Sequence, residues 1–331
     1  MPIKLLMHFR PTLAAVWLFS FHSLTLASGI EPKEIYERAQ ATCVEVIVEG
    51  RLAGSGWFAS KNGHVFTAEH VIHGAPKGSI TLRTNGNGEV PAHVVAVDPG
   101  HDLALLRVSE KKEDSVEQPF LEISQKLPDP GDTAFLFGSA YFRHELMIRG
   151  AVARKNPTYE YLPNSRHYIR CTHVSAPSPL GTSGGCWLNE EGKVVGLQSA
   201  FMSKDGVGMG IAFVIVPEAM RSLLASGRTP ERATIGCGLE ESLSQPKAFL
   251  SRFPAGARGL VPVLHRKGGG AENAGLTGDV LITHIDGVAT PLKDRFIDVV
   301  RAKRPGDKVM LTVLRPSSTE PRQVEVTLDS L

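Results

Sequence analysis

The sequence lacks several features that would indicate other classes of protein. Lysine and arginine outnumber aspartate and glutamate by only two among 331 residues, so the balance of charge does not imply a nucleic-acid partner. The chain contains no H-E-x-x-H motif and no P-loop, and its glycine-rich run at residues 206–210 lacks the spacing of a dinucleotide-binding loop. These absences predict a protein without a bound metal or cofactor.

Cysteine is scarce and widely spaced. The four cysteines are Cys43, Cys171, Cys186 and Cys237, and the closest two are 15 positions apart, so no C-x-x-C metal or redox motif is present. Export from the cytoplasm would permit disulfides, and four cysteines allow three full pairings. Cys171 with Cys186 is the first candidate, because both flank the serine motif described below. An interpretation of all four as small buried residues fits equally well.

Only the N-terminus carries a sustained apolar run. Lys4, His8 and Arg10 precede apolar residues 13–19, which continue more weakly to Ala27. This order predicts a secretory signal peptide over residues 1–28, cleaved near Ala27, and a periplasmic or secreted protein. The minor alternative is an uncleaved membrane anchor. A span requires about 20 apolar residues, and the polar residues at positions 20, 22 and 23 interrupt this one.

The rest of the chain divides into two predicted domains. Residues 32–39 are predicted to be helical, and short β-type runs separated by turns then follow to about residue 216. Frequent Gly and Pro and few helical periods favour a mostly β barrel or sandwich. The first domain is placed at residues 29–225, and a small polar linker that contains Pro230 at residues 226–232.

Residues 233–331 have a different pattern and predict a small α+β domain. Four strand-like runs flank one helical segment, residues 292–302. Phe296, Val299 and Val300 are spaced so that they share one face of this helix. The face is interpreted either as the core of the domain or as part of a groove.

The strongest chemical signal is the run Gly181-Thr182-Ser183-Gly184-Gly185. A serine hydroxyl is a weak nucleophile unless a base takes its proton and donors stabilise the resulting oxyanion. Glycines let the backbone turn tightly and expose N–H groups without an intruding side chain. Ser183 is therefore a candidate nucleophile, with the N–H groups of Gly181 and Ser183 as the oxyanion hole.

A base and an orienting acid can be proposed from their positions. His70 follows a strand-like run and is the candidate base, although His64 and His73 are close rivals. Asp102 opens the apolar run 103–108, where a buried carboxylate needs a partner such as an imidazole N–H. Asp98 precedes Pro-Gly and is interpreted as a turn residue.

Together these motifs resemble trypsin-like serine proteases of the HtrA (Deg) family. The order His, Asp, Ser, with separations of 32 and 81 residues, is that of the chymotrypsin fold, and the resemblance covers roughly residues 33–331. It implies a chymotrypsin-like double β-barrel, mostly β, followed by a PDZ-like domain. The motifs that carry it are Gly54-Ser55-Gly56, Thr67-Ala68-Glu69-His70-Val71, Asp102-Leu103-Ala104, Pro130-Gly131-Asp132, Gly181-Thr182-Ser183-Gly184-Gly185 and Gly208-Met209-Gly210-Ile211-Ala212-Phe213. Thr182 stands where this family usually has Asn, and Cys186 where it usually has Pro, so substrate preference and regulation can differ.

The C-terminal part resembles a PDZ domain through residues 273–281 and 285–287. PDZ domains bind an extended peptide by strand addition and hold its C-terminal carboxylate on backbone N–H groups. The resemblance implies that Ile235, Gly236 and Cys237 form the carboxylate loop, and that Phe296 and Val300 lie along the peptide groove.

The walls of the primary specificity pocket are expected from residues 174–179 and 198–201, chiefly Ala176, Pro177, Ser199 and Ala200. These segments contain no Asp or Glu, which predicts a preference for small or medium apolar side chains.

The sequence therefore predicts a serine endopeptidase with His70, Asp102 and Ser183 as its triad. The resemblance further implies misfolded polypeptides outside the cytoplasm as substrates, and assembly as a homotrimer. The alternative is a non-catalytic chaperone or adaptor that binds peptide C-termini, and the intact set of three residues argues against it.

Overall fold

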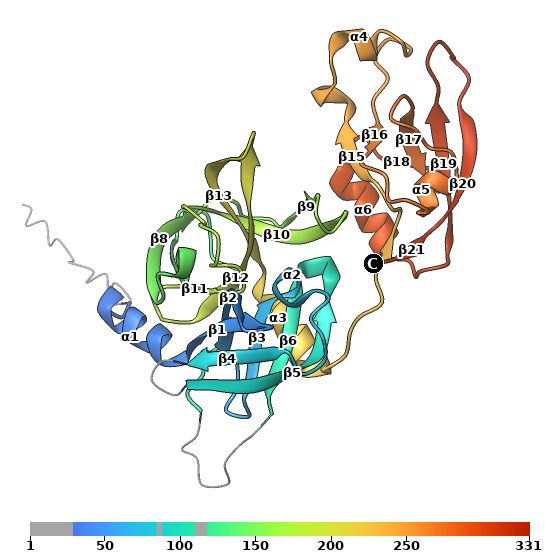
Figure 1. Ribbon diagram of the computed structural model, residues 1–331. Helices are drawn as coiled ribbons and strands as arrows, with labels where there is room; N and C mark the ends of the chain where they lie inside the picture. Colours follow the sequence, from blue (N-terminus) through green and yellow to red (C-terminus); the bar gives the residue numbers. More distant parts are fainter. Residues whose placement is uncertain (1–28, 85–87, 110–117) are drawn as a thin grey trace, which may run out of the picture.

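The computed structural model describes residues 29–84, 88–109 and 118–331. The predicted signal peptide, residues 1–28, lies outside the described residues. Within the described ranges, no helix combines the length and the apolar character needed to cross a membrane. Figure 1 shows two β-barrels side by side, with a separate C-terminal unit beyond them.

The first barrel is built from six antiparallel strands that close on themselves in the order β1-β2-β3-β6-β5-β4. The predicted runs at residues 43–48 and 103–108 coincide with β1 and β6. Its interior is filled by large side chains such as Trp57, Phe66 and Leu105, each no more than 1% exposed. The strands are β1 (Cys43–Val48), β2 (Arg51–Phe58), β3 (His64–Ala68), β4 (Ile80–Thr84), β5 (Gly88–Asp98) and β6 (Leu103–Val108).

The second barrel has the order β13-β12-β11-β7-β8-β10 and closes through pairing of β10 with β13. Strand β9 extends this sheet beyond β10. The mostly β, double-barrel fold class is thus confirmed. The strands are β7 (Thr133–Gly138), β8 (Leu146–Val152), β9 (Thr158–Leu162), β10 (His167–Ser175), β11 (Cys186–Leu188), β12 (Val194–Lys204) and β13 (Val207–Ile215).

Short helices bracket the barrels. Helix α1 precedes β1 and buries Ile35 and Ala39, and α3 follows β13 and ends at Gly227, which adopts the left-handed conformation that favours glycine. The single turn α2 and the 3₁₀ turn η1 each lead from one strand of the first barrel toward the next. The bounds are α1 (Pro32–Thr42), α2 (Glu69–Ile72), η1 (Pro99–His101), η2 (Ala140–Phe142) and α3 (Pro217–Ser226).

The C-terminal unit is a twisted sheet in the order β15-β16-β17-β19-β20, with β18 paired to β17 and a separate β14–β21 pair. Helix α6 packs on it through Phe296, Ile297 and Val300, whereas Val299 of the predicted face is only partly buried. The remaining elements are β14 (Ala233–Thr234), β15 (Gly238–Glu241), η3 (Ser242–Ser244), α4 (Lys247–Leu250), β16 (Leu260–Val263), α5 (Gly270–Asn273), β17 (Leu281–Ile285), β18 (Val288–Ala289), α6 (Lys293–Arg301), β19 (Lys308–Leu314), β20 (Arg322–Thr327) and β21 (Asp329–Ser330).

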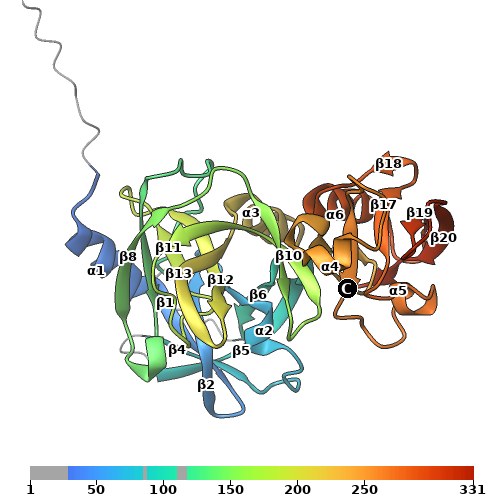
Figure 2. The ribbon, with the colours of Figure 1, turned by 90° about the horizontal axis from the view of Figure 1, so that it is seen from above.

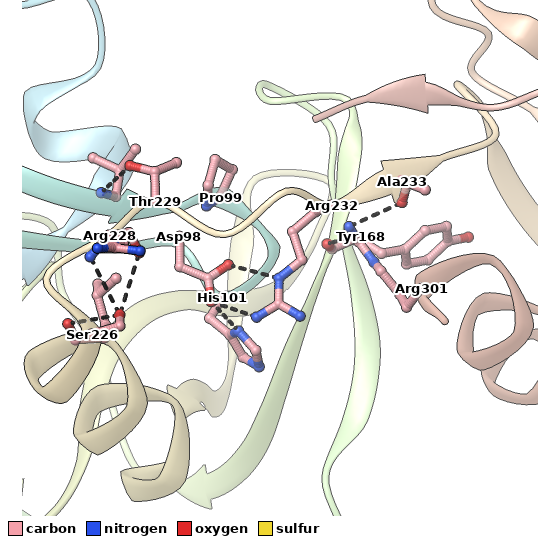
Figure 3. A network of polar contacts seen from close by, with 12 residues as sticks. Asp98, Pro99, His101, Tyr168, Ser226, Arg228, Thr229, Arg232, Ala233 and Arg301 are labelled. Carbon is pink, nitrogen blue, oxygen red and sulfur yellow. Dashed lines mark hydrogen bonds and ion pairs between the residues drawn. The ribbon is translucent and has the colours of Figure 1, made fainter. Parts of the chain in front are cut away.

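A buried ion pair fixes the segment between α3 and β14 to the first barrel (Figure 3). The Arg232 guanidinium donates to both Asp98 carboxylate oxygens, at 3.3 and 2.8 Å, and His101 lies 2.9 Å from the same carboxylate. Burial opposes ionisation of Asp98, but His101 and Arg232 outweigh it and lower its pKa to about 2. Asp98 lies directly before the turn η1, as its position before Pro-Gly predicted, and it is also a buried anchor for Arg232.

The β9–β10 hairpin also joins the two units. Figures 1 and 2 show that β10 leads from the second barrel toward the C-terminal unit. Tyr159 and Tyr168 of this hairpin are buried in the same apolar cluster as Ile235, Phe296 and Val300. The Arg301 guanidinium donates to the Tyr168 carbonyl at 2.7 Å. The hairpin is thus part of the barrel by its strand pairing and part of the C-terminal core by its side chains.

Candidate active site

His70 and Asp102 meet at the edge of the first barrel. His70 lies in α2, directly after β3, and Asp102 follows η1 with φ of +50°, so its short side chain turns inward. The His70 backbone N–H donates to Asp102 Oδ1 at 2.9 Å, and His70 Nδ1 lies 2.8 Å from Oδ2. Because a carboxylate only accepts, Nδ1 carries the proton, which leaves Nε2 of the neutral ring as a base.

Ser199 provides a further contact to this acid. Its hydroxyl donates to Asp102 Oδ2, the same oxygen that accepts from His70. Asp102 is 1% exposed, and a carboxylate buried to this degree needs protein donors in place of water. The His70 N–H, His70 Nδ1 and the Ser199 hydroxyl supply three of them. The sequence predicted Ser199 only as a pocket wall, and nothing in the local pattern indicated contact with a residue 97 positions earlier.

Ser183 lies in a loop that only glycine neighbours can form. Gly184 has φ of +85°, and a Cβ on it would lie 2.1 Å from the Ser55 carbonyl oxygen. Gly181 has φ of +94°, and a Cβ there would lie 2.3 Å from the Ser139 carbonyl oxygen. Gly181 and Gly184, two of the three glycines in the predicted motif, are therefore required by backbone conformation and by close approach.

The N–H groups of Gly181 and Ser183 are available to a substrate oxygen. Within the described ranges, neither donates to a protein acceptor, whereas the carbonyls on either side are held. The Leu180 carbonyl accepts from the Tyr141 N–H at 2.8 Å. The Gly181 carbonyl accepts from the Ser55 hydroxyl at 2.8 Å. This arrangement orients the two free N–H groups, as an oxyanion hole requires.

Ser55 ties the nucleophile loop to the first barrel, a role that the sequence did not indicate. Its backbone N–H donates to the Ser183 carbonyl at 2.8 Å, and its hydroxyl accepts from the Ser139 N–H at 2.9 Å while donating to Gly181. Ser55 is 1% exposed. The loop that carries Ser183 is therefore held by a strand of the opposite barrel.

Ser183 and His70 border one cavity of about 550 Å³. The Ser183 hydroxyl donates to the Ser199 carbonyl at 3.2 Å, and no hydrogen bond joins it to His70 in the part of the chain that the structure describes. For His70 to accept the serine proton, the hydroxyl would have to leave the Ser199 carbonyl. Contacts between a nucleophile and its base are often long until a substrate binds.

The cavity walls agree only partly with the predicted specificity pocket. Ser199 and Ala200 line the cavity, but Ala176 and Pro177 do not. Strand β10 ends at Ser175, and Ala176 turns into the second barrel, where it packs with Val174 and Trp187. The remaining lining is Glu160, Tyr161, Leu162, Pro163, Asn164, Ser165, Ser178, Pro179, Leu180, Thr182, Gln198, Phe201, Met202, Ser203 and Phe213.

Glu160 places an acid in the wall, which the two predicted wall segments did not contain. Its Oε1 lies 3.1 Å from His173 Nε2, and the side chains of both residues are largely buried. The His173 ring in turn packs against Phe213. Because the β9–β10 hairpin supplies this wall, its composition cannot be inferred from the residues around Ser183.

The predicted peptide-binding residues of the C-terminal unit are buried. Ile235, Cys237, Phe296 and Val300 are each no more than 4% exposed. Gly236 adopts φ of +78°, and its carbonyl accepts from the Arg266 N–H at 2.8 Å.

Tyr168 fills the space between α6 and β15. Its hydroxyl accepts from the Leu239 N–H at 2.7 Å and donates to the Leu239 carbonyl at 3.1 Å. The backbone N–H and C=O of Leu239 in β15 are therefore both satisfied by a tyrosine of the barrel domain.

The protonation of His70 is governed by opposing effects. Burial lowers the pKa of the imidazole, but the hydrogen bond and charge of Asp102, together with the charge of Glu69, outweigh it and hold the pKa above its ordinary value of 6.5. A general base must be unprotonated, so activity is expected to fall as pH decreases through this raised pKa.

The variant Glu69→Gln tests this assignment. It removes one negative charge beside His70, so the acid limb of kcat/KM should move to lower pH. His73→Asn keeps that charge while removing the partner of Glu69, and should not move the limb downward. A pH–rate profile with a peptide substrate measures both, and an unchanged limb in Glu69→Gln would contradict the electrostatic role.

Comparison with known proteins agrees with this geometry. Residues 54–197 match the family described as trypsin-like peptidase domain. A probable periplasmic serine endoprotease DegP-like of Pseudomonas fulva (strain 12-X) is 29% identical over 283 residues, which are 84% of this chain and 56% of the relative. A protein with the same description from Ectopseudomonas mendocina (strain ymp) is 30% identical over 292 residues, 86% of this chain and 57% of the relative. The chain thus spans little more than half the length of these relatives.

Solved structures show the same fold along most of the chain. An HtrA-type protease AlgW with decapeptide has a TM-score of 0.63 at 21% identity, covering 91% of this chain and 99% of that one. A serine endoprotease from Yersinia pestis has a TM-score of 0.58 at 23% identity, covering 91% and 98%.

The double barrel and the matched segment define the class of protein, namely that of the trypsin-like peptidase domains. Its relatives are described as DegP-like serine endoproteases and its structural neighbours as HtrA-type proteases, which agrees with the HtrA (Deg) resemblance of the sequence motifs.

Proposed function

We propose that this protein is a serine endopeptidase in which Ser183 attacks the peptide carbonyl and His70 accepts the serine proton. The observation that carries the proposal is one cavity bordered by both Ser183 and His70, whose imidazole is oriented by the Asp102 carboxylate. Within the described ranges, the N–H groups of Gly181 and Ser183 donate to no protein acceptor. Asp102 holds the imidazole and stabilises its charged form. The N–H groups of Gly181 and Ser183 stabilise the oxyanion, and water then hydrolyses the acyl-enzyme.

The substrates are proposed to be unfolded or misfolded polypeptides outside the cytoplasm. The DegP-like relatives are named periplasmic serine endoproteases, which supports export of this chain through the segment at residues 1–28. The apolar lining from Leu180, Phe201, Met202 and Phe213 favours apolar side chains at the primary pocket. Glu160 is the acidic side chain of this lining, so comparing cleavage of peptides that carry Val or Ala with cleavage of peptides that carry Lys or Arg tests the apolar preference.

The C-terminal unit, residues 233–331, is proposed to be a PDZ-like domain that binds peptide C-termini. Its sheet and helix α6 support this assignment. Tyr168 occupies the expected groove, so binding there requires displacement of the hairpin. Assembly as a homotrimer is proposed from the family resemblance.

Labelling with a fluorophosphonate probe tests the proposed chemistry. The purified protein should gain one adduct, which peptide mapping places on Ser183, and the adduct should be lost in Ser183→Ala and His70→Ala. Ser178→Ala is the matched control, because Ser178 borders the same cavity without the base, and this variant should label normally. Absence of an adduct, with and without added unfolded polypeptide, would favour the non-catalytic chaperone or adaptor instead.

A further inference from the structure

Two of the four cysteines face each other across the junction of the barrels. Cys43 opens β1 of the first barrel, and Cys186 opens β11 of the second, three residues after Ser183. Their Sγ atoms are 3.5 Å apart, although 143 positions separate the residues in the sequence. Cys171 and Cys237 are buried, and within the described ranges no such sulfur contact involves them.

Strand pairing holds both cysteines in place. Cys43 is paired with Trp57 of β2, and Cys186 lies between Phe137 of β7 and Leu197 of β12. A disulfide has an S–S distance of about 2.0 Å, so the two sulfur atoms must approach by roughly 1.5 Å. Small side-chain rotations of two adjacent thiols can supply this approach without a change of register.

Cys43 is the less buried of the two thiols. Cys186 is fully buried, whereas Cys43 keeps partial exposure and borders a cavity of about 320 Å³. This cavity lies apart from the one that contains Ser183, and its other lining residues are Gln40, Val44, Glu45, Arg83, Thr84, Phe137, Gly138, Ser139, His144 and Glu145. A small disulfide-containing oxidant would therefore meet Cys43 first.

From these contacts we infer that Cys43 and Cys186 form an inter-barrel disulfide when a disulfide oxidant is present. The Cys43 thiolate attacks one sulfur of the oxidant and releases the first thiol. The Cys186 thiolate then attacks the Cys43 sulfur of the mixed disulfide and releases the second thiol. The two cysteines are oxidised, the oxidant is reduced to two thiols, and these take up the two protons.

The bond would join β1 of the first barrel to β11 of the second, the strand that begins three residues after Ser183. Closing a loop of this length removes much of the freedom of the unfolded chain, so the principal effect is on stability. The pair also differs from the Cys171–Cys186 pairing considered from the sequence. Within the described ranges no sulfur contact joins Cys171 to Cys186, although both lie in the same apolar cluster.

The environment affects the rate of the reaction. Burial, reinforced by the neighbouring Cys186 thiol, raises the pKa of Cys43 well above its ordinary value of 9.0. The thiolate is the reactive form, so oxidation of the folded protein should be slow at neutral pH and faster in alkaline buffer. During folding, before burial, this barrier is absent.

The test uses the full chain with oxidised glutathione as the probe, in two arms. One arm treats the folded, reduced protein in mildly alkaline buffer, and the other refolds it from denaturant under the same oxidant. Free thiols are then alkylated without reduction and the peptides are mapped. The expected product is a cross-linked pair of peptides that contain Cys43 and Cys186, two hydrogens lighter than the reduced pair, with Cys171 and Cys237 alkylated.

Thermal unfolding provides the second measurement. The oxidised protein should melt on the order of 5–10 °C above the reduced protein. The difference should disappear in Cys43→Ser and persist in Cys171→Ala, the matched control for loss of a buried thiol. Alkylation of both Cys43 and Cys186 in both arms, a stable glutathione adduct on Cys43, or a cross-link that includes Cys171 would each overturn the inference.

Discussion

Replacing Asp102 with Asn is expected to lower kcat by about four orders of magnitude while the protein remains folded. The carboxylate accepts from the His70 backbone N–H, from His70 Nδ1 and from the Ser199 hydroxyl. An amide has only one acceptor oxygen, so its NH₂ group must face at least one of these donors. The imidazole can relieve that conflict by moving its proton to Nε2, which removes the base that Ser183 needs.

Ser199→Ala is the matched control for this prediction. It deletes one donor to Asp102 but keeps the carboxylate and the Nδ1–H tautomer, so its loss of kcat should be far smaller than that of Asp102→Asn. Single-turnover acylation of a peptide ester measures the chemical step, and near-ultraviolet circular dichroism checks the fold. A loss of less than tenfold in Asp102→Asn would show that Asp102 does not fix the tautomer of His70.

Much of the fold could be predicted because its signals are local. The β1 and β6 runs have the apolar character that buried strands require, and α6 shows the helical spacing of Phe296 and Val300. The glycines around Ser183 were also informative, because backbone conformation and close contacts exclude other residues at Gly181 and Gly184. The tight loop around Ser183 could therefore be predicted from these glycines.

Other parts of the site depend on contacts between distant segments. Ser55 and Gly181 are 126 positions apart, and Ser199 and Asp102 are 97 apart, so no short pattern links either pair. Glu160 reaches the cavity wall only because the β9–β10 hairpin folds beside it. Ala176 was predicted to line the pocket because it lies close to Ser183 in the sequence. Its side chain instead packs inside the second barrel, which sequence position alone did not indicate.

The expected peptide groove of the C-terminal unit also depends on contacts between distant segments. Ile235, Phe296 and Val300 were placed along a groove or in a core, and spacing alone could not separate these alternatives. The structure buries them with Tyr159 and Tyr168, which belong to the other domain by sequence. The sequence of the C-terminal unit therefore does not indicate that tyrosines of the barrel domain cover these residues.

Replacing Tyr168 with Phe is expected to destabilise the contact between the two units by about 1–3 kcal/mol. The ring would still pack, but the buried Leu239 N–H and C=O would lose the hydroxyl that satisfies both. Burial raises the pKa of Tyr168, so this hydroxyl stays protonated and can donate as well as accept. Tyr168→Ala should cost more, about 3–5 kcal/mol, because it also empties the space between α6 and β15.

Hydrogen exchange of the Leu239 amide measures the effect directly, since this N–H is protected only while the Tyr168 hydroxyl is in place. In Tyr168→Phe, exchange of the Leu239 amide should accelerate by about 5- to 150-fold, because a loss of about 1–3 kcal/mol raises the population of open molecules by this factor. Tyr161→Phe is the matched control on the same hairpin, because its hydroxyl donates to the Leu264 carbonyl at an exposed position, and its loss should change Leu239 exchange little. Equal exchange in the two phenylalanine variants would show that the Tyr168 hydroxyl does not hold β15. Ring packing and other contacts of the hairpin, such as those from Arg301 and Lys293, would then be sufficient.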